Sequence, residues 1–331
     1  MLKGVAIADR IGFFTTYAFL RRKFHKSQIA VLLYHRICTQ NNDWDSNIIS
    51  PNQFKSQIEY FCKRQEIISL ETLSRYIQQG KTLPQKAVVI TFDDGYKDNF
   101  IYAYPILNKN KVPTTIFLTT GHMATDKLFW WDKVGYVIGH SKTKQLHLDE
   151  LGDYALESAE DKTEARLKIT QGLKKITDER KNILIEKLSE ISGVEIPNDL
   201  AKELILSWDN VKEMHGNGIH FGAHTVNHPI LNNLPLKQAK WEITQSKMDI
   251  EKVLGMEILT FSYPNGDYSD ELAKFVSEKG FICAVSVLPS RLIKPRDNIY
   301  AIGRISPEND DEFNVRFSGF YEDLETILHR K

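Results

Sequence analysis

Two adjacent carboxylates, Asp93 and Asp94, follow directly on an apolar run, and this pair could serve in acid–base or metal chemistry. The run Ala87–Phe92 (AVVITF) is rich in β-branched and aromatic residues, which is typical of a buried strand. Gly95 allows the sharp turn that lets both acids face a cleft. Because Asp-Asp-Gly is also a common turn sequence, this motif alone leaves a structural and a catalytic interpretation equally open.

A pair of histidines four residues apart could bind a metal ion. His224 and His228 follow the apolar run 219–223, and a single turn of the chain can bring both imidazoles to one ion. Position 225 is threonine, so the pair is not the His-Glu-x-x-His motif of a zinc protease. A solitary histidine is more often an ordinary core or surface group, but a spaced pair at the end of a strand favours ligation.

Together, the two motifs predict a catalytic metal centre. One aspartate and two histidines supply three ligands and leave coordination positions open, which is how catalytic zinc sites differ from structural ones. Metal coordination lowers the pKa of a bound water to about 7, and the remaining aspartate is then free to take its proton. The residues therefore predict hydrolysis at a carbonyl or phosphoryl centre.

Short apolar runs alternate with helical periodicity along most of the chain and must position these motifs. The runs are 30–34, 87–92, 114–118, 219–223, 259–263 and 281–287, and most are continuous, as in parallel sheets covered on both faces. The helix candidates between them are 53–65, 236–254 and 270–278. This alternation predicts an α/β fold, a barrel or a wound sheet, with its site at the carboxyl ends of the strands.

A charged segment, 161–191, interrupts this alternation. Its apolar residues recur mostly at steps of three and four, which predicts an amphipathic helix or a helical pair inserted into the fold. Aromatic side chains flank the insert, namely Phe129, Trp130, Trp131 and Trp208. These rings either anchor the insert to the core or form a rim that stacks on sugar rings.

Composition excludes several classes of protein. The 331 residues contain 43 Lys and Arg against 43 Asp and Glu, so we expect no basic surface for nucleic acid. Cys38, Cys62 and Cys283 form no Cys-x-x-Cys pair, which disfavours a disulfide framework or a thiolate zinc site and fits a reducing cytosol. No run approaches the roughly 18–20 apolar residues of a membrane-spanning helix.

The N-terminal region carries an apolar run, 11–20, with basic residues after it. A secretory signal has its charge before the apolar run and a cleavage site after it, so this order argues against one. The alternatives are a helix that covers the core, an interfacial helix that rests on anionic lipid, and an uncleaved export segment. We expect a cytoplasmic protein, with peripheral contact at the inner membrane face if this helix binds lipid.

Four motifs resemble those of the polysaccharide deacetylase family, the NodB-homology carbohydrate esterases, and of its exopolysaccharide-related members in particular. They are LYHR at 33–36, TFDDGY at 91–96, HTVNH at 224–228 and FSYPNG at 261–266. The resemblance implies an incomplete (β/α) barrel with a helical insertion at about 123–207. It divides the chain into an N-terminal helix at 1–28 and a deacetylase domain at 29–331.

The resemblance also implies a role for each motif residue. In this family the first aspartate, here Asp93, is the catalytic base. The second, Asp94, joins His224 and His228 in binding a divalent metal, most often zinc. The backbone amide of Asn265 would help to hold the oxyanion, as preorganised donors do in acyl transfer.

By their positions in or beside these motifs, four further residues are expected to contact the substrate, namely Tyr96, Tyr263, Pro264 and Trp131. The substrate itself would be an acetylated glycan.

Two departures from the family pattern leave roles open. Many members carry an arginine where this chain has Ser262, and Arg304 is the candidate to replace it, with an ordinary salt bridge as the alternative. Many members also have a late histidine as general acid, but the only histidine after His228 is His329, near the end of the chain. His35 is a candidate for this role, and a structural role for it is equally open.

The sequence thus predicts a metal-dependent hydrolase that removes N-acetyl groups from an acetamido sugar of a polysaccharide or lipid-linked glycan. An O-acetyl esterase would use the same machinery, and a non-catalytic glycan-binding relative would suit the missing arginine and late histidine. A nucleotide-sugar glycosyltransferase is disfavoured because the chain shows no glycine-rich turn for a diphosphate. The residues do not specify the exact glycan, the native metal or the oligomeric state.

Overall fold

The computed structural model describes residues 29–39, 48–82, 84, 87–287 and 298–307. The helix predicted at 1–28, with its membrane contact, lies outside these residues, as does His329. Within the part of the chain that is described, none of the helices has the length and apolar character needed to cross a bilayer.

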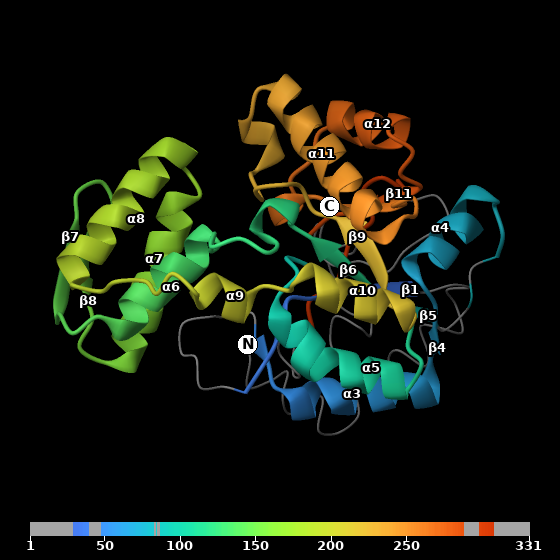
Figure 1. Cartoon of the computed structure of the whole chain (residues 1–331), viewed down its shortest axis with the longest axis horizontal. Helices are drawn as coiled ribbons and strands as arrows, with labels where there is room; N and C mark the ends of the chain where they lie inside the picture. Colours follow the sequence, from blue (N-terminus) through green and yellow to red (C-terminus); the bar gives the residue numbers. More distant parts are fainter. Residues whose placement is uncertain (1–28, 40–47, 83, 85–86, 288–297, 308–331) are drawn as a thin grey trace, which may run out of the picture.

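Parallel strands form the centre of the fold (Figure 1). Their order in the sheet is β1 (Ile29–Tyr34), β5 (Ala87–Phe92), β6 (Thr114–Leu118), β9 (His220–Ala223), β10 (Thr260–Ser262) and β11 (Cys283–Val285). A short strand, β4 (Glu66–Ile67), pairs with the start of β5. Neighbouring strands of this sheet run parallel, so the α/β prediction is confirmed, although β10 and β11 are shorter than the apolar runs that contain them.

A closing segment (residues 299–305) joins the two edges of the sheet. Its Ile302 forms a parallel bridge with Val285 of β11, and its Ile305 forms one with Leu32 of β1. The sheet therefore curls into an incomplete barrel, as predicted, and these few residues span the remaining gap.

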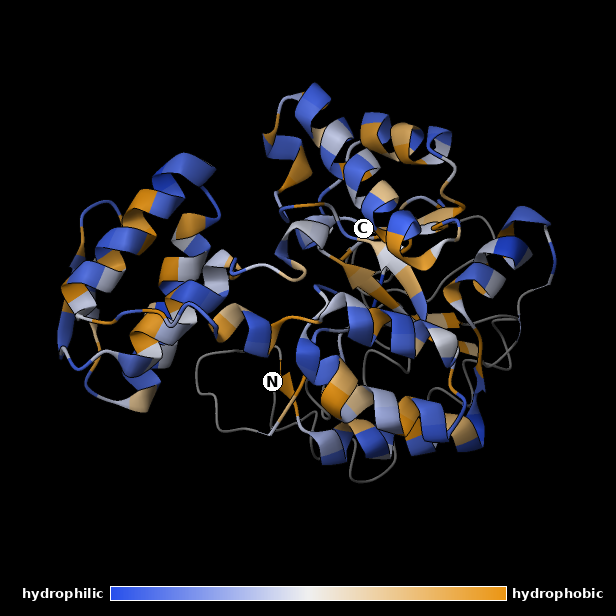
Figure 2. Ribbon diagram, in the orientation of Figure 1, coloured by the Kyte–Doolittle hydropathy of each residue, from blue (hydrophilic) through white to orange (hydrophobic). Residues whose placement is uncertain are grey.

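Helices surround the sheet and present an apolar and a polar side (Figure 2). They are α3 (Pro51–Arg64), α4 (Leu70–Gln78), α5 (Tyr104–Lys109), α10 (Trp208–Gly216), α11 (Leu236–Leu254) and α12 (Asp270–Glu278). Local sequence starts them: Ser50, for example, caps α3 by accepting a hydrogen bond from the amide of Gln53, with Pro51 in the first turn. Strands β1 and β5 are buried along their whole length, because both of their faces are covered.

Smaller elements connect these parts. A parallel pair is formed by β2 (Arg36–Ile37) and β3 (Ile48–Ile49). Short π or 3-10 turns are η1 (Asn99–Ala103), η2 (Thr120–His122), η3 (Leu231–Asn233) and η4 (Pro264–Gly266).

An insert lobe (residues 130–204) stands beside the barrel, at the left of Figure 1. It contains α6 (Trp130–His140), the strands β7 (Gln145–Leu148) and β8 (Gly152–Ala155), α7 (Ala159–Leu173), α8 (Asp178–Ser192) and α9 (Leu200–Leu204). The lobe has a hydrophobic cluster of its own, to which Val137, Ile169 and Leu184 belong. Two helices, α7 and α8, occupy the segment for which the sequence predicted a helix or a helical pair.

The antiparallel hairpin of β7 and β8 was not predicted. Its strands have four residues each, and every second residue or more is exposed. So short a half-buried stretch gives too little alternation to stand out from a loop.

Candidate active site

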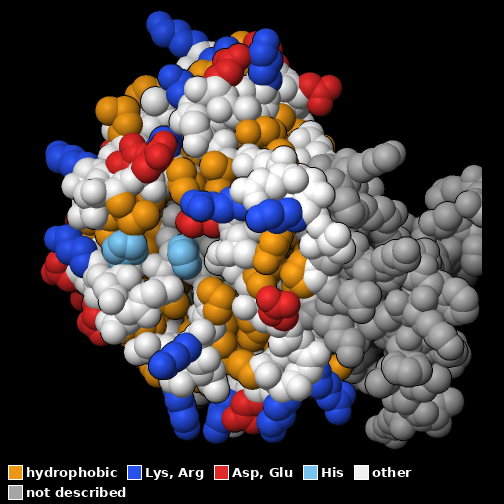
Figure 3. Space-filling model, turned by 90° about the vertical axis from the view of Figure 1, so that its right-hand side faces the viewer, with side chains coloured by type: hydrophobic (Ala, Val, Ile, Leu, Met, Phe, Trp, Pro, Cys, Tyr) orange, Lys and Arg blue, Asp and Glu red, His pale blue; other side chains and the backbone are white. Residues whose placement is uncertain are grey.

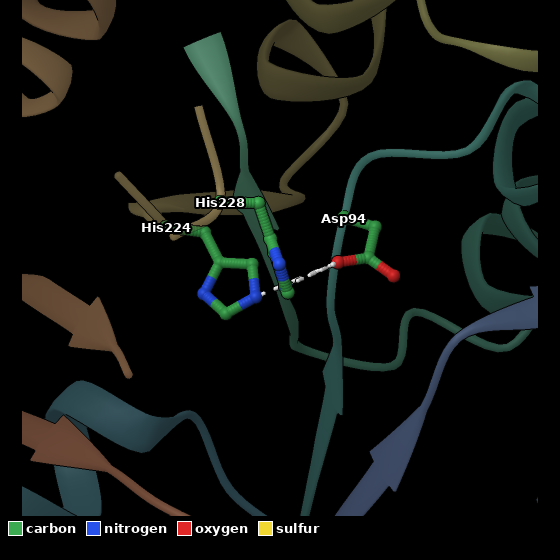
Figure 4. A group of neighbouring side chains, drawn as sticks. All are labelled: Asp94, His224 and His228. Carbon is green, nitrogen blue, oxygen red and sulfur yellow. Dashed lines mark ion pairs between the residues drawn. The ribbon is translucent and has the colours of Figure 1, made fainter. Parts of the chain in front are cut away.

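Three side chains from two strand ends converge on one point (Figure 4). Asp94 follows β5, and His224 and His228 follow β9. The Oδ1 atom of Asp94 lies 3.5 Å from Nε2 of His224 and 3.4 Å from Nε2 of His228. The three potential ligand atoms lie within 4.8 Å of one another. The structure thus brings together the residues in which the sequence predicted a metal centre.

The chemistry of this donor set fits a divalent cation. The Oδ1 atom of Asp94 is buried and has no hydrogen-bond partner among the described residues, which is costly unless a cation faces it. The Nδ1 atom of His224 lies 2.8 Å from the carbonyl oxygen of Ser262, so Nδ1–H donates there and Nε2 is left for a metal. Aspartate and imidazole together are a common ligand set for zinc.

The ring of His228 is also suited to ligation. Burial, partly opposed by the charge of Asp94, lowers the pKa of His228 to about 3. Its imidazole is therefore neutral at pH 7, and only the neutral ring offers a lone pair to a metal. Burial likewise acts to lower the pKa of His224, but the charges of Asp93 and Asp94 outweigh it and raise that pKa. A cation at the site would take the place of the proton that these carboxylates attract.

A buried glutamate on α11 fixes the loop that carries the histidines. Thr225 and His228 adopt left-handed backbone conformations, with φ of 66° and 56°, which is unfavourable for residues other than glycine. Glu242, which is only 2% exposed, accepts hydrogen bonds from the amides of Val226 (2.8 Å) and Asn227 (2.9 Å). Sequence analysis missed Glu242, because one glutamate in an amphipathic helix resembles any solvent-facing residue.

Asp93 makes a two-point contact with Arg304 beside the triad, and its Oδ2 lies 3.8 Å from Nε2 of His224. Its Oδ1 accepts from Nη1 (2.7 Å) and its Oδ2 from Nη2 (2.6 Å), and the Ser262 hydroxyl donates to Oδ2 (3.1 Å). Burial alone would raise the pKa of Asp93, but the charge of Arg304, with that of His224, outweighs it and lowers the pKa well below its usual range. Asp93 is therefore ionised at neutral pH, held in one orientation and buried.

The closing segment explains how Arg304 reaches this carboxylate. Arg304 lies between the two bridges that join the segment to β1 and β11, so its side chain enters the barrel. It is only 2% exposed, and its guanidinium also donates to the carbonyl of Ser286 (3.3 Å) and the hydroxyl of Thr91 (3.2 Å). Ser262, which the sequence analysis treated only as a missing arginine, supplies a hydroxyl to the same carboxylate.

These groups form the floor of a cavity of about 470 Å³. From the barrel side it is lined by Asp93, Asp94, His224, His228, His35 and Asn265, among others. From the insert lobe it is lined by Trp130, Trp131, Arg166, Leu167, Thr170, Gln171, Lys174 and Lys181. The cavity thus lies between the two parts of the molecule, and from the second part the sequence analysis had named only Trp130 and Trp131 as possible contacts of a sugar.

Trp131 both anchors the insert lobe and faces the cavity. Its Nε1 donates to the hydroxyl of Tyr96 (2.8 Å), which in turn donates to the buried carboxylate of Asp132 (3.1 Å). The ring of Trp131 lies 4.7 Å from that of His228. The anchoring interpretation therefore holds for this side chain, and its position at the cavity leaves stacking on a sugar ring as a prediction. Tyr96 also lines the cavity, but its hydroxyl is used within the protein.

Two residues expected to contact the substrate do not reach the cavity. Tyr263 is fully buried, and its hydroxyl donates to the carbonyl of Tyr300 (3.1 Å). Pro264 is buried beside it in η4. Both belong to the core behind the turn that presents Asn265, whose φ is 57°. We therefore correct the expectation: these two residues shape the turn, and Asn265 lies at the cavity.

His35 lies at the cavity as well, at the end of β1. Its carbonyl accepts a hydrogen bond from Nδ2 of Asn99 (2.8 Å), which holds the backbone of this turn. Its position is compatible with the role predicted for it as a proton donor, which stays a prediction.

Comparisons with known proteins agree with this geometry. The pattern that defines the family described as "Polysaccharide deacetylase" matches residues 80–284. The "Putative polysaccharide deacetylase YxkH" of Bacillus subtilis (strain 168) is 23% identical over 280 residues, covering 84% of this chain and 71% of that protein. The "Poly-beta-1,6-N-acetyl-D-glucosamine N-deacetylase" of Staphylococcus aureus (strain COL) is 23% identical over 319 residues, covering 92% of this chain and 87% of that protein.

Solved structures share the fold. The Streptococcus pyogenes deacetylase PplD, in complex with acetate, aligns with a TM-score of 0.58 and 20% identity, covering 88% of this chain and 98% of its own. IcaB from Ammonifex degensii aligns with a TM-score of 0.58 and 17% identity, covering 88% of this chain and 97% of its own. At these identities the two structures establish the fold alone.

Proposed function

Because this chain belongs to the polysaccharide deacetylase family, we propose that it is a metal-dependent hydrolase that removes N-acetyl groups from an acetamido sugar of a glycan. One observation carries the proposal. A buried carboxylate held by Arg304 lies beside an Asp/His/His ligand set on the floor of a single cavity. Two carboxylates in contrasting surroundings suit two different tasks, one in binding a cation and one in moving a proton.

Zinc is the metal that we propose, held by Asp94, His224 and His228. Bound there, it would polarise the acetyl carbonyl and provide an activated water, so that neutral pH suffices for hydrolysis. The orphaned Oδ1 of Asp94 and the neutral ring of His228 support this assignment.

Asp93 is the proposed general base. Its ionised carboxylate accepts the proton of the attacking water, while Arg304 and Ser262 hold it in the orientation required. The backbone amide of Asn265, on the left-handed turn at the cavity, is the proposed donor to the oxygen that becomes negative as the carbonyl is attacked.

The reaction adds a hydroxyl group to the acetyl carbon and a proton to the sugar nitrogen, so that acetate and an amine leave. The nitrogen must receive its proton from a group at the cavity. His35 is the candidate, and the proton taken up by Asp93 is the alternative source. An alanine variant of His35 separates them, because acetate release falls strongly only if His35 supplies the proton.

The names of several relatives support an acetamido sugar as substrate. Those of Staphylococcus epidermidis and Staphylococcus aureus are named as N-deacetylases of poly-β-1,6-N-acetyl-D-glucosamine. The indole of Trp131, beside the metal ligands, is placed to stack on a sugar ring.

A cytoplasmic location, predicted from the cysteine content, remains a proposal that cell fractionation tests.

Acetate release tests the function. The protein, loaded with zinc or treated with a chelator, is incubated with β-1,6-linked N-acetylglucosamine oligosaccharides and with O-acetylated glycans. We expect metal-dependent release, faster from the amide than from the ester. Release from esters alone would make the protein an O-acetyl esterase. Tight binding of zinc and glycan without release from either would favour the non-catalytic relative.

A further inference from the structure

Three cationic side chains of the insert lobe line the cavity opposite the metal ligands. Arg166 lies on α7, Lys174 directly follows it, and Lys181 lies on α8. Arg166 and Lys181 are each only 8% exposed, which is rare for charged side chains and requires compensation by partners or ligands. Side chains as buried as these contribute little to solubility.

The described partners of Lys174 and Lys181 leave positive charge on the wall. Lys181 pairs with Asp178 (2.6 Å) and lies 4.8 Å from the centre of the Trp130 ring, so it is partly compensated. Lys174 donates to the neutral Oδ1 of Asn265 (2.8 Å). The Nδ2 of Asn265 in turn donates to the carboxylate of Asp267. The Lys174 ammonium has donors left for an incoming acceptor, because each ammonium carries three protons.

The floor of the cavity does not offset this charge. Asp93 is compensated by Arg304, and Asp94 faces the proposed cation. No other carboxylate of the described residues lines the cavity. The outer face of the molecule that lies away from the insert lobe is different, since acidic and basic side chains are interspersed there (Figure 3). Positive charge is thus concentrated where the substrate must bind.

We propose that Arg166, Lys174 and Lys181 form a subsite for an anionic group of the acetylated glycan, a carboxylate or a phosphate. This inference rests on the proposed function, and it specifies the substrate class: an acetamido sugar joined to a negatively charged neighbour. Guanidinium and ammonium groups bind both anions through charge-assisted hydrogen bonds. A cavity of about 470 Å³ is within the range of ordinary ligand sites.

Equilibrium binding tests the subsite without requiring turnover. The zinc-loaded Asp93→Asn protein is titrated with a tetrasaccharide of alternating N-acetylglucosamine and glucuronate, and with the same molecule after methyl esterification of its carboxylates. A second pair compares N-acetylglucosamine 1-phosphate with methyl N-acetylglucosaminide. We expect at least one acid to bind about tenfold more tightly than its neutral counterpart at low salt, and the preference to shrink at high salt.

Single substitutions locate the preference. Lys174→Gln and Lys181→Gln should each reduce it several-fold, while Lys175→Gln removes a neighbouring lysine that does not line the cavity and should leave it unchanged. Equal affinity for acid and neutral ligand in both pairs would overturn the subsite, and so would a preference that survives both substitutions. The pair that shows the preference identifies the source of the charge, a uronate or a phosphate.

The subsite and the proposed function can each be refuted while the other stands, because separate measurements test them. Acetate release from neutral N-acetylglucosamine oligosaccharides reports on the chemistry alone. Release without any charge preference would leave the deacetylase and remove the subsite. Charge-dependent binding with no release from any glycan would leave the subsite and remove the deacetylase.

Discussion

The two sides of the cavity are built in different ways. On the barrel side, Asp93, Asp94 and His224 are buried at strand ends. Asp93 is held by Arg304 of the closing segment and by Ser262 of β10, which also holds His224. On the side of the insert lobe, the lining residues lie on helices that pack around a separate hydrophobic cluster. The floor thus has the rigidity that bond-making chemistry needs, and the lobe can differ in its lining residues without disturbing the barrel.

The titratable groups of the barrel and of the insert lobe also differ in what shifts their pKa values. The pKa of Asp93 is a balance between burial and ionic partners inside the barrel. In the lobe, the lowered pKa values of Asp149 and Asp161 arise at exposed groups, chiefly from hydrogen bonds that Lys187 donates to Asp149 and that Ser158 makes with Asp161. Substitutions on the floor should therefore reduce stability and activity much more than substitutions in the lobe.

Arg304→Met should have the largest effect. It leaves the buried charge of Asp93 without its main partner, and breaking such a pair costs about 3–5 kcal/mol of folding stability. Acetate release should fall at least about 100-fold, because the base is no longer oriented or kept ionised. Thermal unfolding and acetate assays check both. Arg304→Lys keeps the charge but not the two-point contact, so its stability and its rate of acetate release should lie between those of Arg304→Met and the parent. Activity of Arg304→Met within threefold of the parent would show that the pair is only structural.

Glu242→Gln should weaken zinc binding about 10- to 100-fold, as is typical for residues that orient metal ligands. The backbone amides of Val226 and Asn227 both donate to Oε2 of Glu242, and a neutral amide oxygen accepts such bonds more weakly than a carboxylate does. The NH2 group of glutamine also cannot accept from Nδ2 of Asn227 as Oε1 does. Competition with a chromophoric chelator measures the affinity, and excess zinc should restore activity. Glu251→Gln, on the same helix but bonded to Lys247 and Ile258, is the matched control and should leave zinc affinity unchanged. Equal zinc affinities for both variants would refute the role of Glu242.

Trp131→Ala should raise KM about tenfold with a smaller change in kcat, because a buried aromatic contact with the substrate is worth about 1 kcal/mol or more. Trp131→Phe keeps a flat ring and should recover most of the loss. Trp241→Ala removes a half-exposed tryptophan on α11, outside the cavity, and serves as the control. An unchanged KM for Trp131→Ala would restrict this residue to anchoring the lobe.

Asp161→Asn should have the smallest effect. Asp161 closes the capping box of α7 with Ser158, and hydrogen bonds from Ser158 lower its pKa below the value in the unfolded chain. Its contribution to stability is thus present above the unfolded pKa and is lost as the pH falls through the folded one. Hydrogen exchange in α7 should be faster in the variant at pH 6, and this difference should shrink as the pH falls and the carboxyl group is protonated. A difference that stays constant as the pH falls would contradict this account.

The strand ends were predictable from sequence because their signals are local. A continuous apolar run followed by Asp93-Asp94-Gly95, or by the spaced histidines, needs no knowledge of the rest of the chain. The sequence left undecided whether Arg304 contacts Asp93, because this depends on how residues 299–305 span the barrel edges. Glu242, Lys174 and Arg166 left no signal, because their roles arise only when distant segments meet around the cavity. Tyr263 was misplaced because a motif position does not reveal which side of a turn faces the cavity.

The most direct test of the account compares Asp93→Asn with Asp94→Asn, two isosteric changes at adjacent positions. We predict that Asp93→Asn binds one zinc ion with nearly the affinity of the parent and loses about 100- to 10,000-fold in acetate release. We predict that Asp94→Asn loses zinc affinity, and activity with it. Acetate release by zinc-loaded Asp93→Asn within tenfold of the parent, or undiminished zinc binding by Asp94→Asn, would contradict the division of tasks between the two carboxylates.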